Sequence, residues 1–320
     1  MLLFDRGLFV SHPRIGIDVK RGCSVGFVSH AHFDHMAPHK LAFCSPVTAE
    51  FYQFRIGDRP VRVIEFGDSI EFAGLRMTLY PAGHVFGSAM LLLEQNDVRV
   101  LYTGDFRLEE ACTAEPIEEI PSADVLIMES TFGVPKYSFP NRRQLTDELL
   151  SSVQKIISNG DAPVIFAYAF GKAQEVTAIL TRSGITVYQD PEIFQLSKIY
   201  ERLGQDLGDY RCFNGQSTTG AVLVLPVGPK SSAVAEIHRA KTLSVSGWAN
   251  SQHAGAARAT DYSIPLSDHA DYPQLLQMAE RVAPRRIYCT HGPKCFSTDL
   301  RQRGYDARHL DRATAYCLEL

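Results

Sequence analysis

One short segment constrains this chain more than any other. Residues 28–35 read Val-Ser-His-Ala-His-Phe-Asp-His, so three histidines and one aspartate fall within six positions. In a turn that follows a strand, His30 and His32 project to one side, while Asp34 and His35 turn toward a second point. Imidazole and carboxylate groups suit zinc and similar divalent ions. The segment therefore predicts a metal site at a strand end, with its remaining ligands supplied from elsewhere in the fold.

Further ligand-type residues follow predicted strands in other parts of the chain. His84, Asp105 and His291 come shortly after the predicted strands 75–80, 98–103 and 286–290, respectively. Gly83 permits a tight turn before His84, and the two carboxylate oxygens of Asp105 could bridge two metals. Each residue alone would be an ordinary loop residue. Together they favour a dinuclear site.

The pattern of apolar residues up to Phe132 is typical of strands. Short β-branched and apolar runs alternate there with glycines and polar turns. Residues 1–10 are interpreted as one such strand. The other strands are expected at 61–66, 69–72, 75–80, 88–94, 98–103 and 124–128.

Between Phe132 and Ile264 helical and strand patterns alternate, which predicts a parallel α/β layer. Helices are expected at 142–158, 171–182 and 192–203, and strands at 163–168, 185–188, 221–226 and 242–247. A helix at 272–282 and a strand at 286–290 follow. We therefore expect an α/β insert at 133–262 that splits a β-rich host domain formed by residues 1–132 and 263–320.

The sequence resembles the metallo-β-lactamase superfamily. The resemblance lies in the segment His30-Ala31-His32-Phe33-Asp34-His35 and in the later residues His84, Asp105 and His291. This resemblance implies an αββα sandwich with the metals at one edge. It implies one zinc on His30, His32 and His84, and a second on Asp34, His35 and His291, with Asp105 between them. It also implies that Asp18 orients a ligand histidine from behind.

Two further residues narrow the resemblance to the β-CASP nuclease branch, and the similarity covers nearly the whole chain. Glu129 stands at a strand end just before the insert, and His269 stands just after it. With His291 they resemble the three markers of that branch. The resemblance implies that the insert, which lies between Asp105 and His291, is a β-CASP domain.

The segment 169–175 also matches the branch, where a strand gives way to a helix. Helix N-termini bind phosphate through free amides and the helix dipole. Gly171 and Lys172 at this helix start are therefore predicted to contact a backbone phosphate beyond the scissile bond.

Phosphodiester hydrolysis fits these residues. It needs an activated hydroxide, neutralisation of charge at phosphorus and a proton for the leaving oxygen, and two metals about 3.5–4 Å apart supply the first two. His269 is a suitable general acid near pH 7, and Glu129 could orient it and keep it protonated. The expected mechanism has a metal-bridged hydroxide attack phosphorus while His269 protonates the departing O3′. Asp34 and Asp105 belong to the same catalytic set.

The choice between DNA and RNA rests on analogy. His291 at the third marker is typical of RNA-processing members, whereas eukaryotic DNA repair members usually carry Val there. The segments 167–174, 246–248 and 267–271 instead resemble prokaryotic ligase-associated DNA exonucleases, also described as mRNA 3′-end processing factor-like exonucleases. We expect a stand-alone exonuclease on single-stranded DNA, which the resemblance associates with a DNA ligase or helicase. The alternative is an RNA-processing endo- or exoribonuclease.

Two other function classes compete with a nuclease. A small-molecule hydrolase of the same fold would cleave an ester, thioester or lactam, but it has no need of a separate acid over an extended groove. A non-catalytic subunit would typically have lost metal ligands, and every ligand position here is filled. Cleavage polarity, endo or exo mode, oligomeric state and the choice between zinc and manganese stay open.

Composition and charge narrow the classes of protein to which this chain can belong. The formal charge of −4 excludes a uniformly basic coat for nucleic acid, although a local basic groove is compatible with it. The seven cysteines are odd in number and include no CxxC pair, which argues against a disulfide framework and a thiolate zinc site. No apolar run approaches the ~18 residues of a membrane span. We expect a cytoplasmic protein.

Overall fold

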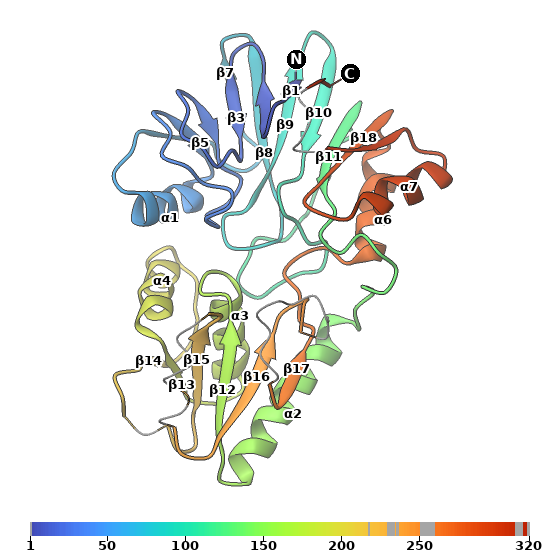
Figure 1. Ribbon diagram of the computed structural model, residues 1–320. Coiled ribbons are helices and arrows are strands. Elements are labelled where there is room, and N and C mark those ends of the chain that lie inside the picture. The colour runs from blue at the N-terminus through green and yellow to red at the C-terminus, as the bar shows by residue number, and fades with distance from the viewer. Residues whose placement is uncertain are drawn as a thin grey trace. The chain divides into compact units, whose positions relative to one another are not determined.

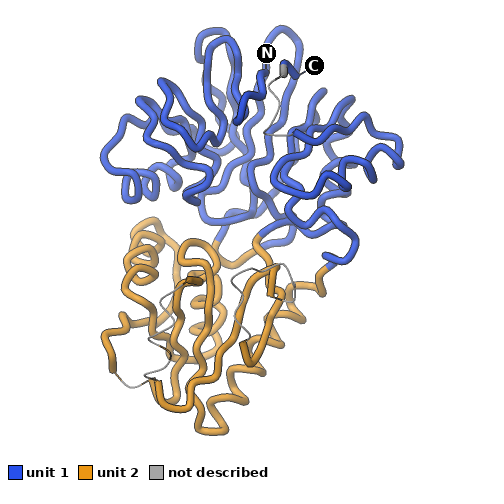
Figure 2. Tube along the Cα trace, in the orientation of Figure 1, with its two compact units in different colours: residues 1–110, 114–138, 269–320 blue, residues 111–113, 139–268 orange. Residues whose placement is uncertain are grey.

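The protein divides into two compact units (Figure 2). A computed structural model describes residues 2–216, 218–228, 234, 237–249, 260–310 and 316–318. Unit 1 comprises residues 1–110, 114–138 and 269–320, and unit 2 comprises residues 111–113 and 139–268. The predicted insert 133–262 starts and ends six residues before the main segment of unit 2. Its identity as a separate β-CASP domain stays a prediction.

Unit 1 contains two seven-stranded sheets (Figure 1). The first has the order β20 (Tyr316–Cys317), β1 (Leu2–Phe4), β2 (Leu8–Val10), β3 (Ile15–Ile17), β4 (Gly26–Phe27), β5 (Ala42–Cys44), β6 (Val61–Val63). The second has the order β19 (Ala307–His309), β18 (Arg286–Thr290), β11 (Val125–Glu129), β10 (Val98–Tyr102), β9 (Ala89–Gln95), β8 (Leu75–Pro81), β7 (Ser69–Phe72).

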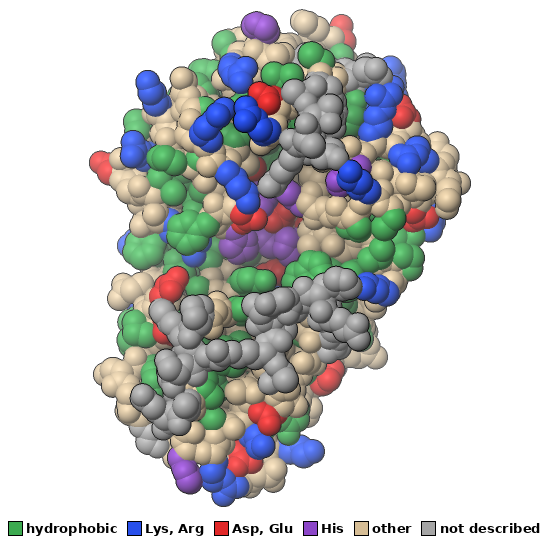
Figure 3. Space-filling model, in the orientation of Figure 1, with side chains coloured by type: hydrophobic (Ala, Val, Ile, Leu, Met, Phe, Trp, Pro, Cys, Tyr) green, Lys and Arg blue, Asp and Glu red, His purple; other side chains and the backbone are tan. Residues whose placement is uncertain are grey.

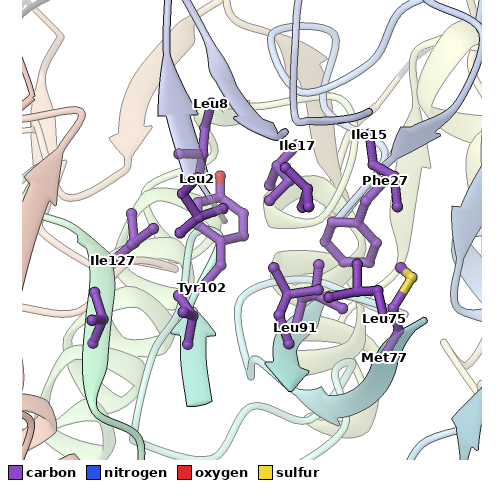
Figure 4. Close-up of a cluster of buried hydrophobic side chains, with 14 of the residues drawn as sticks. Leu2, Leu8, Ile15, Ile17, Phe27, Leu75, Met77, Leu91, Tyr102 and Ile127 are labelled. Atoms are coloured by element: carbon purple, nitrogen blue, oxygen red, sulfur yellow. The ribbon is translucent and has the colours of Figure 1, made fainter. Parts of the chain in front are cut away.

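The two sheets pack face to face over one apolar core (Figure 4). Ile17 of the first sheet and Leu91 and Ile127 of the second belong to this cluster. Successive strand residues point to opposite faces of a sheet. Leu92 of β9 therefore joins a second cluster on the outer face, together with Leu275 of α6 (Tyr272–Val282) and side chains of α7 (Lys294–Gln302). On the other side, α1 (Pro46–Ile56) contacts β6. The predicted αββα layering is confirmed.

In its described residues, unit 2 contains a six-stranded parallel sheet and three helices. Its strand order is β14 (Tyr210–Cys212), β13 (Val187–Gln189), β15 (Val222–Pro226), β12 (Ala162–Ala167), β16 (Ala240–Val245), β17 (Tyr262–Ile264). The helices are α2 (Arg142–Ser158), α3 (Lys172–Arg182) and α4 (Pro191–Arg202). All five residues of β15 are buried, as expected for a central strand with both faces covered. The predicted parallel α/β layer is confirmed.

One prediction about the first 132 residues was wrong, and one helix was not predicted. Residues 1–10 are not one strand, because the turn around Arg6, which has a positive φ of 52°, separates β1 from β2. Helix α1 was not predicted. Its start carries a recognisable signal: the Ser45 side chain accepts a hydrogen bond from the Thr48 amide, and proline occupies the first turn.

Among the helices that the described residues form, none is long and apolar enough to cross a membrane.

Candidate metal centre and its acid–base pair

The candidate residues converge because their strands end at the same edges. In the second sheet β10, β11 and β18 are parallel neighbours, and β8 runs in the same direction because it pairs antiparallel with β9, which is antiparallel to β10. His84, Asp105 and His291 follow three of these strands, and Glu129 ends the fourth. In the first sheet β3 and β4 are parallel, and Asp18 follows β3. The sequence thus places ligand types at the carboxyl ends of aligned strands.

The first donor set consists of three imidazoles around a single point. The Nδ1 atom of His32 lies 3.0 Å from Nε2 of His30 and 3.1 Å from Nε2 of His84. The Oδ2 atom of Asp105 lies 3.6 Å from the same nitrogen of His30 and 4.0 Å from that of His84. Ligand atoms on a tetrahedral zinc, with Zn–N bonds of about 2.0–2.1 Å, would lie about 3.3 Å apart. The spacing suits one small divalent ion.

The second donor set shares Asp105 with the first. Its Oδ2 atom lies 3.2 Å from Nε2 of His35, and its Oδ1 atom lies 3.8 Å from Nδ1 of His291. Asp34 reaches the edge of this set, with its Oδ2 atom 3.8 Å from Nε2 of His35 and with 61% of its side chain exposed. Within the part of the chain that the structure describes, Oδ1 of Asp105 is buried and accepts no hydrogen bond. Because an unpaired buried carboxylate oxygen is costly, this atom fits a bridging metal ligand.

Asp18 orients His35 from behind. Its Oδ2 atom lies 2.8 Å from Nδ1 of His35 and also accepts hydrogen bonds from the hydroxyls of Ser29 and Tyr102, while its Oδ1 atom accepts one from the Ser29 amide. The carboxylate favours a proton on Nδ1 of His35, which leaves Nε2 to face Asp105. The structure therefore places the Asp18 carboxylate behind His35, and its role at a metal centre stays a prediction.

Burial and neighbouring charges shift the pKa values of three residues of this cluster in different directions. Burial lowers the pKa of His30 well below its ordinary value. Burial alone would raise the pKa of Asp105, but the neighbouring His35 and His269 imidazoles hold it well below the usual range. For His35 burial acts to lower the pKa, yet the carboxylates of Asp105 and Asp18 raise it well above normal. Metal binding at His35 would therefore release a proton.

Glu129 and His269 form a pair beside the metal donors. Nδ1 of His269 lies 3.0 Å from both carboxylate oxygens of Glu129, which is fully buried. The carboxylate also accepts hydrogen bonds from the Phe106 amide at 2.8 Å and from the Thr131 hydroxyl at 2.5 Å. The His269 ring lies 4.5 Å from the His84 ring, centroid to centroid. Glu129 is therefore fixed on several sides and can orient the histidine next to the donor sets.

The phosphate contact at Gly171 and Lys172 stays a prediction, and in the structure both residues bond to neighbouring side chains. The Gly171 amide donates to the side chain of Gln174 at 2.8 Å. The Lys172 side chain is 0% exposed, and its Nζ atom lies 2.7 Å from Glu175, which also pairs with Arg142. The amide and the cation are therefore satisfied inside unit 2. Glu175 stands three residues after Lys172 in the sequence, and this spacing was the available sign of a helical ion pair.

Ser88 and Arg107 hold the His84 turn, and neither was predicted from the sequence to do so. The Ser88 hydroxyl accepts hydrogen bonds from the His84 and Val85 amides at 3.1 and 3.2 Å. Arg107 is 2% exposed, and its guanidinium donates to the Gly83 carbonyl at 3.1 Å. A Cβ atom at Gly83 would lie 2.3 Å from the Arg107 carbonyl oxygen. Only glycine fits this turn, and the buried arginine holds it from the inner side.

Comparison with known proteins gives these donors a context. A domain family described as "Zn-dependent metallo-hydrolase RNA specificity domain" matches residues 257–314, which include His269 and His291. A protein of Opitutus terrae named "Probable DNA ligase" is 37% identical over 311 residues, which are 95% of this chain and 30% of that protein. An "RNase J-like protein" of Methanocaldococcus jannaschii is 28% identical over 204 residues, which are 54% of this chain and 48% of that protein. The chain thus spans less than half the length of either relative.

A solved structure supports the fold independently. The crystal structure of a protein of unknown function from Enterococcus faecalis superposes with a TM-score of 0.63 at 15% sequence identity. The match covers 92% of this chain and 80% of that one. At this identity the similarity concerns the fold alone.

Proposed function

Because this chain belongs to the β-CASP nuclease branch of the metallo-β-lactamase superfamily, we propose that it is a metal-dependent nuclease that hydrolyses phosphodiester bonds. The observation that carries the proposal is the Glu129–His269 pair beside two metal donor sets. A metal cluster alone would serve any hydrolase of this fold. A buried carboxylate that holds a histidine next to that cluster supplies what a poor leaving group needs, which is a proton.

The donor sets fit two divalent ions, in line with the domain family's description as zinc-dependent. His30, His32 and His84 would hold one ion, and His35, His291 and Asp34 the other, with Asp105 between them. When bound, such ions supply a hydroxide near neutral pH and neutralise charge on the phosphoryl oxygens. Manganese also suits these nitrogen and oxygen donors.

His269 would act as the general acid. Its Nδ1 faces Glu129, so Nε2 is the nitrogen that would give a proton to the departing O3′. The Glu129 carboxylate stabilises the protonated imidazole and fixes its orientation. The product then carries a 5′-phosphate. Glu129 itself acts through His269 and needs no contact with the substrate.

The substrate we propose is DNA, cut by an exonuclease that acts in the cytoplasm. The match to the protein named "Probable DNA ligase" supports DNA, because it runs over 95% of this chain at 37% identity. The match to the "RNase J-like protein" favours the alternative, RNA processing, but it covers 54% of this chain at 28% identity. Association with a DNA ligase is part of the same proposal.

A competition assay separates a nuclease from a small-molecule hydrolase. The metal-loaded protein is given bis(p-nitrophenyl) phosphate, alone and with increasing single-stranded DNA or RNA. We expect slow hydrolysis of the small ester and its inhibition by nucleic acid, because both need the same centre. Hydrolysis of a lactam or thioester that nucleic acid leaves unchanged would contradict the proposal.

A further inference from the structure

Phe33 lies in the loop that carries several candidate metal donors, yet most of its surface is exposed. It stands between His32 and Asp34, and 63% of the residue is exposed, the highest value among the large hydrophobic residues that the structure describes as exposed. Single exposed apolar residues are common on protein surfaces, so exposure alone does not indicate a binding role. The position of Phe33 does indicate one, because the residues on both sides of it belong to the candidate metal centre.

Arg55 of α1 supports the Phe33 ring from one side. Its Cζ atom lies 4.5 Å from the ring centroid, and its Nη1 atom donates to the Ala31 carbonyl at 2.8 Å. A guanidinium over an aromatic face is attractive, and the hydrogen bond ties that guanidinium to the same loop. The ring is therefore held beside the donors. Figure 3 shows that histidines reach the surface and that hydrophobic side chains lie beside them.

We propose that Phe33 is a stacking platform for one nucleobase of the substrate, next to the phosphodiester bond that is cut. The inference rests on the proposed function and adds to it the place where a base is held. An aromatic ring offers a face to any base, so such contacts are tolerant of sequence. Inside a duplex both faces of a base are covered by its neighbours, so the platform favours single strands or frayed ends. Arg55 is a positioning residue that acts through Phe33.

The test measures binding rather than cleavage. Metal-loaded wild-type protein is titrated into fluorescent phosphorothioate strands, which resist hydrolysis, and anisotropy gives the dissociation constants. Phe33→Ala should weaken binding of a single strand at least about fivefold, the lower limit for losing one stacked base. Phe33→Trp should restore it, and binding of a blunt duplex should change little. Phe54→Ala is the matched control. Phe54 is a second exposed phenylalanine, with 54% of its surface exposed, but it lies in α1, outside the donor loop.

A strand with one abasic site, moved along the sequence, locates the stacked base. At one position the abasic strand should bind wild-type protein as weakly as the intact strand binds Phe33→Ala, with no further loss when both changes combine. Equal binding of an intact strand by wild-type and Phe33→Ala protein would overturn the platform, as would an equal loss in Phe54→Ala. If wild-type protein neither binds nor cuts DNA or RNA, the proposed function itself fails. That outcome is distinct, because it does not depend on Phe33.

Discussion

Asp105 is the residue on which both donor sets depend. Its two oxygens face His35 and His291, and one of them is buried without a hydrogen bond among the described residues. Asp105→Ala should therefore lose bound metal and nuclease activity together. Metal content of the purified variant, measured by mass spectrometry, checks this directly. Asp58→Ala removes an exposed carboxylate and is the control. An Asp105→Ala protein with two bound metals would show that the bridging role is wrong.

Replacing His269 should lower the cleavage rate without changing metal binding. It lies against Glu129 rather than inside either imidazole set, so His269→Ala should keep the metal content of the wild type. Its cleavage rate should fall by about 10²–10⁴, the usual contribution of a general acid. Single-turnover cleavage from pH 6 to 8 measures this. A wild-type rate across that range would remove His269 from the mechanism.

The candidate metal donors stand out in the sequence, but the residues that hold them in place do not. Histidine and aspartate types at strand ends are a local signal, so His84 and Asp105 stand out. The hydrogen bonds that fix them come from long-range neighbours, such as Tyr102 on Asp18 and Arg107 on Gly83. The partner and the burial of Lys172 likewise follow from packing rather than from its place at a helix start.

At the scale of single elements, the ion network at the start of α3 should support unit 2. Glu175 is nearly buried and pairs with both Lys172 and Arg142. Glu175→Gln would leave buried positive charge without its partner, so unfolding by urea should show a loss of about 3–5 kcal/mol. Exchanging Lys172 for Met in the same chain should recover part of the loss. If Glu175→Gln unfolds like the wild type, the network contributes nothing to stability.

The loop that carries Glu115 should give a pH-dependent stability. This carboxylate accepts the Gly87 amide at 2.8 Å, and burial raises its pKa above the ordinary value. An acid with a raised folded-state pKa contributes stability below its unfolded pKa and loses that contribution as pH rises through the folded pKa.

Glu115→Gln keeps an acceptor for Gly87 and removes the buried charge. The stability of the variant minus that of the wild type should therefore be larger at pH 7–8 than at pH 4. Thermal unfolding of both proteins at several pH values measures this difference. A constant difference between the two proteins across this range would mean that Glu115 does not titrate with folding.

At the scale of the whole molecule, the sequence predicted the long helices and the layers better than the short elements of the first sheet. Long periodic segments are informative over many residues, and the predicted helices 142–158 and 272–282 coincide with α2 and α6. Helix α1 was missed because its apolar pattern is weak and only its capping residues mark it. The short strands of the first sheet have two or three residues each, so they owe their form to pairing with the neighbouring strands rather than to local preference.

One measurement tests the central claim most directly: a cleavage time course on matched single strands of DNA and RNA, labelled at the 5′ or 3′ end, with zinc or manganese. We predict metal-dependent, progressive shortening of DNA from one end, which also gives the polarity. Internal cuts, or cutting of RNA alone, would assign the protein to RNA processing. No cutting of either strand by protein that carries two bound metals would contradict a nuclease.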